Sequence, residues 1–331
     1  MTTKPIVVAI TPDGVNNFRT LPPSFTIDGQ LYLIHYTAIY ESIAHGPFGQ
    51  QDNVEVRTNY DCHIKYTHGG DFDGSLFDNK CVVLPRTSKF GQYNDFLKFR
   101  REVPTILNMP RVHFQRHTYT GNRGLPVATA SVPVTPKVVV KLNHGSRGGD
   151  QMLVPSNMLA TVIKHGAYKT AAGLAEMFPD IIMISGDNDN VAWLKNPEDY
   201  VVTEYVENVN KEYRLLVSGG NIYIKERVIR HGDYPQSNLN VNAYPTIDPV
   251  IYRNIYDSEL PETVCDAVHA YVKWLKFPLG SIDLFHTVDD KWGMFEHSPQ
   301  FAFHGANLDF IRELHMNAVH HIVQNFEHYK A

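Results

Sequence analysis

Two acidic residues late in the sequence could share one hard cation. Asp283 ends the segment GSID, Glu296 lies in the segment FEHSP, and both segments have the short apolar character of strands. Carboxylates at the ends of neighbouring strands can converge on one ion, and Mg²⁺ prefers such oxygen ligands and shares them with nucleotide phosphates. The alternative is that these two acids lie on the solvated rim of a sheet.

A lysine followed by a glycine-rich segment could hold phosphate groups. Lys141 belongs to the valine-rich run KVVVKL, and the segment NHGSRGGD follows it. Glycines let backbone N–H groups approach phosphate oxygens closely, and a lysine neutralises their charge. Because the lysine precedes the glycines, the order is not that of a P-loop. The alternative is a glycine-rich hairpin turn, and the loop residues singled out are Gly145, Ser146, Gly148 and Gly149.

A third segment could hold the rest of a nucleotide. The stretch TEYVE at 203–207 has the composition of an extended segment, whose backbone groups can pair with the edge of an adenine. Further along, Glu212 could hold ribose hydroxyls and Arg214 could reach a phosphate. A sheet edge that carries surface charges is the more frequent explanation for any one of these residues.

The surrounding sequence predicts alternating strands and helices. Short apolar runs indicate strands at 6–11, 81–84, 137–142, 151–154, 200–206, 214–217, 221–224, 280–284 and 292–295. Apolar spacing of three and four residues predicts helices at 31–45, 94–101, 156–178, 261–275 and 307–329. The stretch 47–79 is rich in Gly, Asp, Asn and His and predicts a long loop or hairpin. The fold class is therefore α/β, and the N-terminal part should form a small parallel sheet.

Composition limits the classes of partner. The net charge is −5 and no block of Lys or Arg is present, so we expect no nucleic-acid partner. No apolar run reaches the roughly 18–20 residues that span a bilayer, so we expect no membrane partner. The first residues indicate a strand and not a signal peptide, and the three scattered cysteines fit a reducing cytosol. We therefore expect a cytoplasmic protein, and a homo-oligomer is possible.

Taken in order, these segments resemble the ATP-grasp superfamily. The resemblance is greatest to the RimK-type ligases, which add glutamate to a ribosomal protein, and to glutathione synthetase. It covers most of the chain and includes the segments CVVLPR at 81–86, PTILN at 104–108, GLPV at 124–127 and SNL at 237–239. It implies an ATP-grasp fold, in which two α+β lobes clasp ATP, after a small parallel-sheet α/β domain. The implied domains are 1–105 and 106–331, the latter with a lid lobe at about 126–203 and a large lobe at about 204–331.

The resemblance also implies a reaction and the residues that perform it. Such enzymes use ATP and Mg²⁺ to join a carboxylate to an amine through an acyl phosphate, and they release ADP and phosphate. The substrates would be an amino acid, a peptide or a protein terminus, held by the loops 47–79, 231–250 and 300–306. The implied nucleotide contacts are Arg111, Lys141, Gly145, Ser146, Gly148, Gly149, Glu204, Tyr205, Val206 and Glu212. The implied catalytic residues are Arg214, Arg227 and Asn238, and the implied metal ligands are Asp283, Glu296 and Ser298.

Three positions depart from the family pattern. Ser298 stands where the family has asparagine, which leaves open whether one or two metal ions bind. Arg111 stands where the family has an early lysine, and Glu212 replaces an aspartate. His297 cannot replace the asparagine, because the immediate neighbour of Glu296 on a strand points to the opposite face. Two alternatives to ligation remain, namely a nucleotide-binding module without catalysis and an ATP-grasp kinase.

Overall fold

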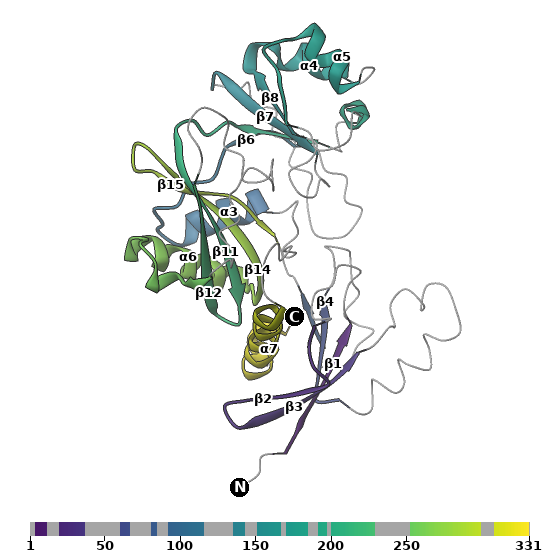
Figure 1. The fold of residues 1–331 in the computed structure, drawn as a ribbon, viewed down its shortest axis with the longest axis vertical. Coiled ribbons are helices and arrows are strands. Elements are labelled where there is room, and N and C mark those ends of the chain that lie inside the picture. Colours follow the sequence, from purple (N-terminus) through teal and green to yellow (C-terminus); the bar gives the residue numbers. More distant parts are fainter. Residues whose placement is uncertain are drawn as a thin grey trace, which may run out of the picture.

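The structure is a computed structural model of the chain. It describes residues 4–11, 20–36, 60–66, 81–84, 92–115, 135–142, 151–166, 170–184, 191–196, 200–228, 252–298 and 308–330. Within these ranges, three five-stranded sheets follow one another along the long axis of the molecule (Figure 1). The predicted α/β class is confirmed.

The N-terminal sheet is mostly parallel, as predicted. Strand β1 pairs in parallel with β3 and β4, β4 pairs in parallel with β5, and only β2 is antiparallel to its neighbour. Across the sheet the strands are β2 (Ser24–Ile27), β3 (Gln30–Tyr36), β1 (Ile6–Thr11), β4 (Cys62–Tyr66) and β5 (Cys81–Leu84).

Two predictions for this region differ from the structure in the residues that it describes. The predicted helix at 31–45 begins instead as strand β3, in which Tyr32 and Ile34 are buried, and residues 37–45 lie outside the described ranges. A tight turn joins β2 to β3 because Asp28 and Gly29 both adopt positive φ, which suits a two-residue hairpin. The predicted loop or hairpin at 47–79 contains strand β4, which lies beside β1 in the sheet.

The second sheet carries its helices on one face. Its order is β6 (Val112–Gln115), β10 (Tyr200–Glu204), β7 (Lys137–Leu142), β8 (Gln151–Pro155) and β9 (Ile182–Ile184), and all pairs are antiparallel. The predicted helix at 156–178 is present in pieces: a short 3₁₀ turn at 156–158, then α4 (Leu159–Gly166) and α5 (Ala171–Met177). Val138 and Val140 of β7 are buried beneath α4.

The third sheet is the largest and is covered on its back by two helices. Its order is β13 (Arg253–Asn254), β12 (Asn221–Val228), β11 (Val209–Ser218), β14 (Leu279–Thr287) and β15 (Trp292–Ser298). Helices α6 (Glu262–Leu275) and α3 (Gln92–Glu102) bury their apolar residues against it, and both were predicted with nearly these bounds. Strands β11, β14 and β15 are longer than predicted, so more of their residues pair with the neighbouring strand.

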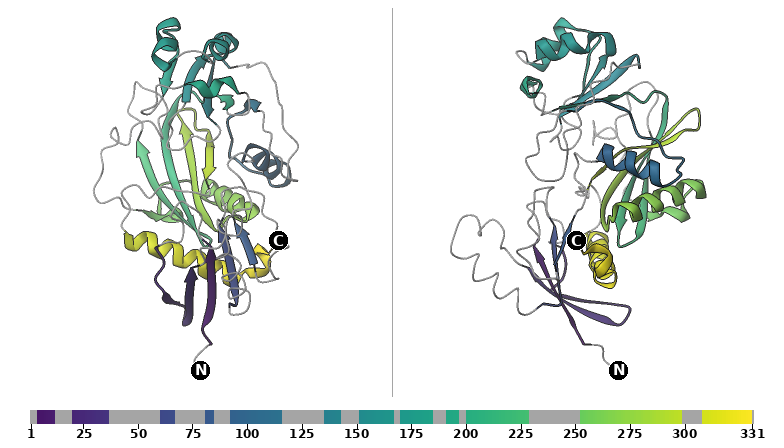
Figure 2. Two further views of the ribbon diagram at one scale, coloured as in Figure 1. Left: turned by 90° about the vertical axis from the view of Figure 1, so that its right-hand side faces the viewer. Right: turned by 180° about the vertical axis from the view of Figure 1, so that it is seen from behind.

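Helix α7 (Leu308–Gln324) lies between the N-terminal sheet and the third sheet (Figures 1 and 2). Its residues Leu314 and Ala318 share a core with Val8 and Ile64 of the N-terminal sheet and with Leu216 of β11. The Ser218 hydroxyl donates to the Leu314 carbonyl. The predicted helix at 307–329 ends at Gln324 and is followed by the short helix α8 (Phe326–Tyr329).

Candidate functional site

A row of charged residues crosses the third sheet on one face. Arg214 of β11 is the Cα partner of Asp283 of β14, and Asp283 is the Cα partner of Glu296 of β15. On the other side, Lys225 of β12 is the Cα partner of Arg214. Directly opposed residues of antiparallel strands project from the same face of a sheet. The register therefore places two cations and two carboxylates side by side.

Arg214 and Asp283 form a partly buried ion pair. Arg214 Nη1 donates to both carboxylate oxygens of Asp283, at 3.2 and 3.1 Å, and Nη2 donates to Ser281 Oγ at 3.2 Å. The Arg214 side chain is 16% exposed and the Asp283 side chain 4%. Three hydrogen bonds therefore fix the guanidinium on this face. Charge-assisted bonds of this kind are stronger than neutral ones.

Lys141 connects this row to the second sheet. Its Nζ lies 3.8 Å from Glu296 Oε2, and the two side chains are 18% and 20% exposed. On β7, Val138 and Val140 point to the helix-covered face, so Lys141 points to the opposite face. The uncovered face of the second sheet thus meets the charged row of the third sheet. Lys141, Arg214, Asp283 and Glu296, all singled out from the sequence, lie together.

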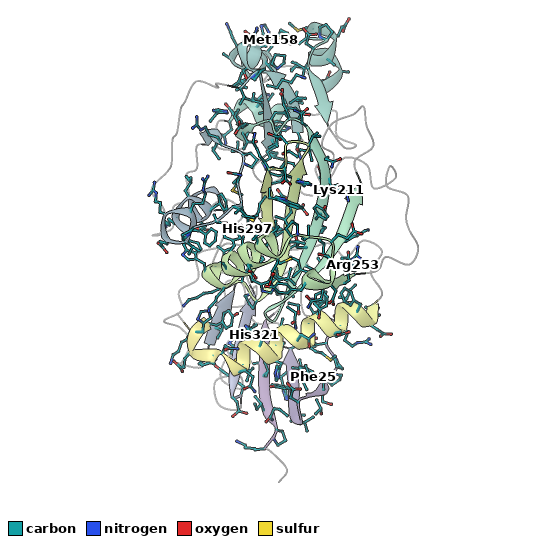
Figure 3. All side chains as sticks on the ribbon, turned by 90° about the vertical axis from the view of Figure 1, so that its left-hand side faces the viewer. Phe25, Met158, Lys211, Arg253, His297 and His321 are labelled. Atoms are coloured by element: carbon teal, nitrogen blue, oxygen red, sulfur yellow. The ribbon has the colours of Figure 1, made fainter. Side chains whose placement is uncertain are left out.

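The residues next to Arg214, Asp283 and Glu296 along their strands point to the opposite face of the third sheet, which the helices cover. Leu215, Ile282 and His297 are fully buried there. The Tyr271 hydroxyl of α6 lies 2.9 Å from His297 Nδ1, and burial lowers the pKa of His297 to about 4. Figure 3 shows His297 next to α6. As expected from its position beside Glu296, this histidine belongs to the core and does not face the charged row.

Three polar residues extend the row along the strands. Ser298 is the Cα partner of Ser281, on the face that carries Glu296 and Asp283. Ser281 is 2% exposed and was not singled out from the sequence, although it lies two residues before Asp283 on the same strand. Glu212 is two residues before Arg214, is 1% exposed, and is the Cα partner of Phe285.

The segment that joins the second and third sheets begins at the end of β10. The Glu204 N–H donates to the Arg111 carbonyl at 2.8 Å, and the Arg111 N–H donates to Glu204 Oε2 at 3.2 Å. The Tyr205 N–H donates in the other direction, to the Lys137 carbonyl at 3.4 Å. In an extended segment the backbone groups of alternate residues face the same side. The Val206 N–H therefore faces the Arg111 side, and no bond from it to the described residues is present.

A pocket of about 750 Å³ opens beside the connecting segment and is lined by Arg111 on one side of it and by Lys137 on the other. Its volume lies within the usual range for small-molecule sites. Phe285, two residues from Asp283 on the same face of β14, forms part of its wall, so the pocket adjoins the charged row. Phe285 and Lys137 were not singled out from the sequence. The lining includes Met109, Arg111, Val112, Lys137, Glu204, Tyr205, Val206, Asn208 and Phe285.

The carboxylates present fit a magnesium ion that is shared with phosphates. Among the described residues, no group of three or more His, Cys, Asp or Glu side chains is arranged to hold a metal on its own. Asp283 and Glu296 nevertheless lie side by side on neighbouring strands. Mg²⁺ is commonly bound through one or two carboxylates, while water and substrate phosphates complete its coordination.

Several residues singled out from the sequence lie outside the described ranges. Arg227 lies on β12 as the Cα partner of Glu212, two residues along the strand from the charged row, and its side chain is not described. The loops 231–250 and 300–306 also lie outside those ranges. The same holds for Gly145, Ser146, Gly148, Gly149 and Asn238. Among the described residues, no helix is long and apolar enough to cross a membrane.

No protein-family model and no curated protein sequence matches the chain. Solved structures with a similar arrangement include the ATP-grasp ligase PsnB complexed with a minimal precursor, at 12% identity and a TM-score of 0.49, covering 96% of this chain and 100% of that chain. D-alanine–D-alanine ligase from Bacillus anthracis complexed with ATP has 12% identity and a TM-score of 0.45, covering 96% and 97%. L-amino acid ligase from Bacillus licheniformis has 14% identity and a TM-score of 0.45, covering 96% and 75%. At TM-scores below 0.5, these likenesses alone assign neither a family nor an activity.

Proposed function

We propose that this chain is an ATP-dependent carboxylate–amine ligase of the ATP-grasp type, which forms an amide or peptide bond and releases ADP and phosphate. The observation that carries the proposal is the charged row at the contact of two sheets. Lys141 of one sheet meets Glu296 of the other, next to Asp283 and Arg214 and beside the pocket.

The pocket suits the base of ATP. Glu204, Tyr205 and Val206 line it, and their backbone groups would pair with an adenine, while Phe285 supplies an aromatic wall. Tyr205 and Arg111 complete this end of the nucleotide site. Glu212, the Cα partner of Phe285 on the neighbouring strand, would hold the ribose hydroxyls.

The charged row suits the phosphates and a magnesium ion. Asp283 and Glu296 would hold Mg²⁺, which neutralises developing charge on the phosphates when bound. Lys141 and Arg214 would bind phosphate oxygens, together with the loop that contains Gly145, Ser146, Gly148 and Gly149. Arg227 and Asn238 are proposed to contact the transferred phosphoryl group or the substrate carboxylate. Ser298 would add a weaker oxygen ligand at the end of the row.

The proposed reaction has two steps. An oxygen of the substrate carboxylate attacks the γ-phosphorus of ATP, and the bond to the β–γ bridging oxygen breaks to release ADP. The amine nitrogen then attacks the carbonyl carbon of the acyl phosphate, the carbon–oxygen bond to phosphate breaks, and the amine proton passes to solvent or phosphate. The protein contributes position and charge neutralisation. Exclusion of water is essential, because water would hydrolyse the acyl phosphate.

The wider assignments follow from the same proposal. We propose that residues 1–105 form the N-terminal domain, that 126–203 form the lid lobe, and that 204–331 form the large lobe. The acceptor would be an amino acid, a peptide or a protein terminus, as in the RimK-type ligases. We also propose a cytoplasmic location, where ATP for the proposed reaction would be available.

The direct test is release of ADP by the purified protein with Mg²⁺, ATP and a panel of amino acids and peptides. We expect ADP only when a carboxylate and an amine are both present, together with a condensed product by mass spectrometry. AMP as the product would contradict the acyl-phosphate route. The serine at position 298 favours a second candidate, a nucleotide-binding module, which would bind ATP tightly without turnover of any pair. Phosphorylation without condensation would instead indicate a kinase.

A further inference from the structure

Each carboxylate proposed for the metal is paired with a cation proposed for the phosphates. We propose that metal and nucleotide bind to this chain by exchange of ion pairs, so that each ligand releases the residues that bind the other. The inference rests on the function proposed above and concerns the coupling between the two ligands. It assigns Arg214 and Lys141 a second role, as residues that hold the metal-binding carboxylates until phosphate arrives.

The first exchanging pair is Arg214 and Asp283. Both oxygens of Asp283 accept hydrogen bonds from Arg214 Nη1, and only 4% of the Asp283 side chain is exposed. A metal ion that binds Asp283 alone would therefore compete with a guanidinium already in contact with it. Ser281 Oγ, 3.2 Å from Arg214 Nη2, would keep the guanidinium on this face when the pair opens.

The second pair is Lys141 and Glu296, which spans two sheets. Their charged atoms are 3.8 Å apart, and both side chains are about four-fifths buried. A nucleotide phosphate that takes Lys141 would release Glu296 for the metal. A metal that takes Glu296 would release Lys141 for the phosphate. Either ligand therefore opens both ion pairs.

Charge balance makes the exchange cooperative. The four side chains carry two positive and two negative charges in a site that is largely shielded from water. A metal alone would leave two cations beside it without their carboxylates, and a nucleotide alone would leave two carboxylates beside a polyanion. Removal of one partner from a buried ion pair is strongly unfavourable, because it leaves the other charge buried without compensation. Both ligands together leave every charge with a partner, and by linkage each must raise the affinity for the other by the same factor.

A metal ion that merely bridges protein and phosphate would also couple the two ligands, so the coupling alone is not diagnostic. The exchange makes a reciprocal prediction that bridging does not make. Removal of a cation should raise the affinity for metal in the absence of nucleotide. Removal of a carboxylate should raise the affinity for nucleotide in the absence of metal.

The first experiment measures Mn²⁺ binding to the full chain by electron paramagnetic resonance, without nucleotide. Mn²⁺ is a suitable probe because it takes the same hard oxygen ligands as Mg²⁺. We expect Arg214→Gln to bind Mn²⁺ about tenfold or more tightly than the unmodified chain, which corresponds to the loss of one competing charge-assisted contact. Unchanged or weaker Mn²⁺ binding would overturn the exchange.

The second experiment measures ADP binding by calorimetry in a chelating buffer. We expect Asp283→Asn to bind ADP several-fold more tightly than the unmodified chain, because Arg214 no longer pairs with a carboxylate. With excess Mg²⁺ the same variant should bind ADP more weakly than the unmodified chain. A variant that binds ADP more weakly in both buffers would contradict the proposal.

Lys273→Gln is the control for a general change of charge, because Lys273 is exposed on α6, which covers the opposite face of the third sheet. An equal gain in Mn²⁺ affinity in this variant would mean a general change of charge and would also overturn the exchange. Arg214→Lys, which keeps the charge but loses the guanidinium geometry, should give a smaller gain and serves if Arg214→Gln does not fold. Absence of ADP binding by the unmodified chain with Mg²⁺ would instead refute the proposed function. Normal binding of ADP with unchanged reciprocal affinities would refute only the exchange.

Discussion

His297 and Tyr271 form a hydrogen bond directly behind the charged row, with 2.9 Å between the tyrosine hydroxyl and the imidazole Nδ1. Both side chains are fully buried. One step along β15, Glu296 faces Lys141 on the opposite side of the sheet. Adjacent residues of one strand therefore serve the core and the candidate site separately, so each can be changed with little effect on the other.

The first prediction tests this separation. His297→Phe should lower the free energy of unfolding by about 1–3 kcal/mol, because the Tyr271 hydroxyl loses a buried partner. Its affinity for ADP and Mg²⁺ should remain that of the unmodified chain. Tyr271→Phe is the matched change, and the double variant should cost less than the sum of the two single variants. Chemical denaturation and calorimetry measure the two properties, and a large loss of ADP affinity in His297→Phe would place this residue in the site after all.

The second prediction concerns Lys141. Lys141→Ala should abolish ADP release and weaken nucleotide binding, because it removes the cation that the second sheet contributes. The overall fold should persist, since the side chain lies outside the core of the second sheet. Lys164→Ala, on the outer helix α4, is the control and should retain activity. Full activity in Lys141→Ala would remove this residue from the site.

The third prediction tests the base pocket. Phe285→Ala should weaken ADP binding about tenfold or more, since stacking of a base on an aromatic ring contributes about 1–3 kcal/mol. Phosphoryl transfer at the charged row should be less affected. The variant should therefore lose affinity for ADP, while its rate of phosphate release at saturating ATP should change less. Val288 lies on the adjacent turn and is 70% exposed, so the control variant Val288→Ala should bind ADP normally. Equal ADP affinity in the two variants would exclude Phe285 from the base site.

The fourth prediction concerns pH and His315 of helix α7. Burial lowers the pKa of His315 from its ordinary 6.5 to about 3, and its Nδ1 lies 2.6 Å from Thr20 Oγ1. The folded chain keeps this histidine neutral, whereas the unfolded chain takes up a proton below pH 6.5. Stability should therefore fall as pH is lowered, by about 2 kcal/mol from this residue between pH 6.5 and 5. His315→Gln should flatten this dependence, as measured by chemical denaturation at pH 6.5 and at pH 5.

The fifth prediction compares two glycines with positive φ. A Cβ at Gly219 would lie 2.4 Å from the Asn317 carbonyl oxygen of α7, whereas a Cβ at Gly29 would meet nothing within 4 Å. Gly29→Ala should lower the free energy of unfolding by about 1–2 kcal/mol through backbone strain alone. Gly219→Ala should cost clearly more, because α7 must also shift away from the β11–β12 turn. Equal losses of stability in thermal unfolding would mean that α7 tolerates the shift.

The residues of the candidate site that the sequence singled out and the structure brings together lie in segments with a strong strand pattern. Lys141 follows three valines, and Asp283 ends an apolar run, so residue type and local structure agreed. Ser281 and Phe285 escaped notice because a serine and a phenylalanine in a strand are ordinary. Only the register of β14 against its neighbours gives them a place beside Asp283 and at the pocket.

The incorrect elements show what local patterns omit. Leu31 and Ile34 have a spacing that suits a helix, but pairing with β1 and the turn at Asp28 fix the segment as a strand. Strand β4 was missed because polar residues surround its short apolar centre, and its stability comes from β1. Such pairing is set by residues distant in sequence, which a local window does not contain.

The position of α7 also constrains the order in which the chain can fold. The N-terminal strands leave the ribosome first, yet the apolar face of their sheet, with Val8, Ile10 and Ile64, is closed by Leu314 and Ala318 from the last part of the chain. Contacts of such long sequence separation slow folding, and this face of the N-terminal sheet stays exposed until α7 is made. Removal of α7 should therefore yield an aggregating chain and not a smaller working unit. We therefore expect the N-terminal sheet and α7 to fold together.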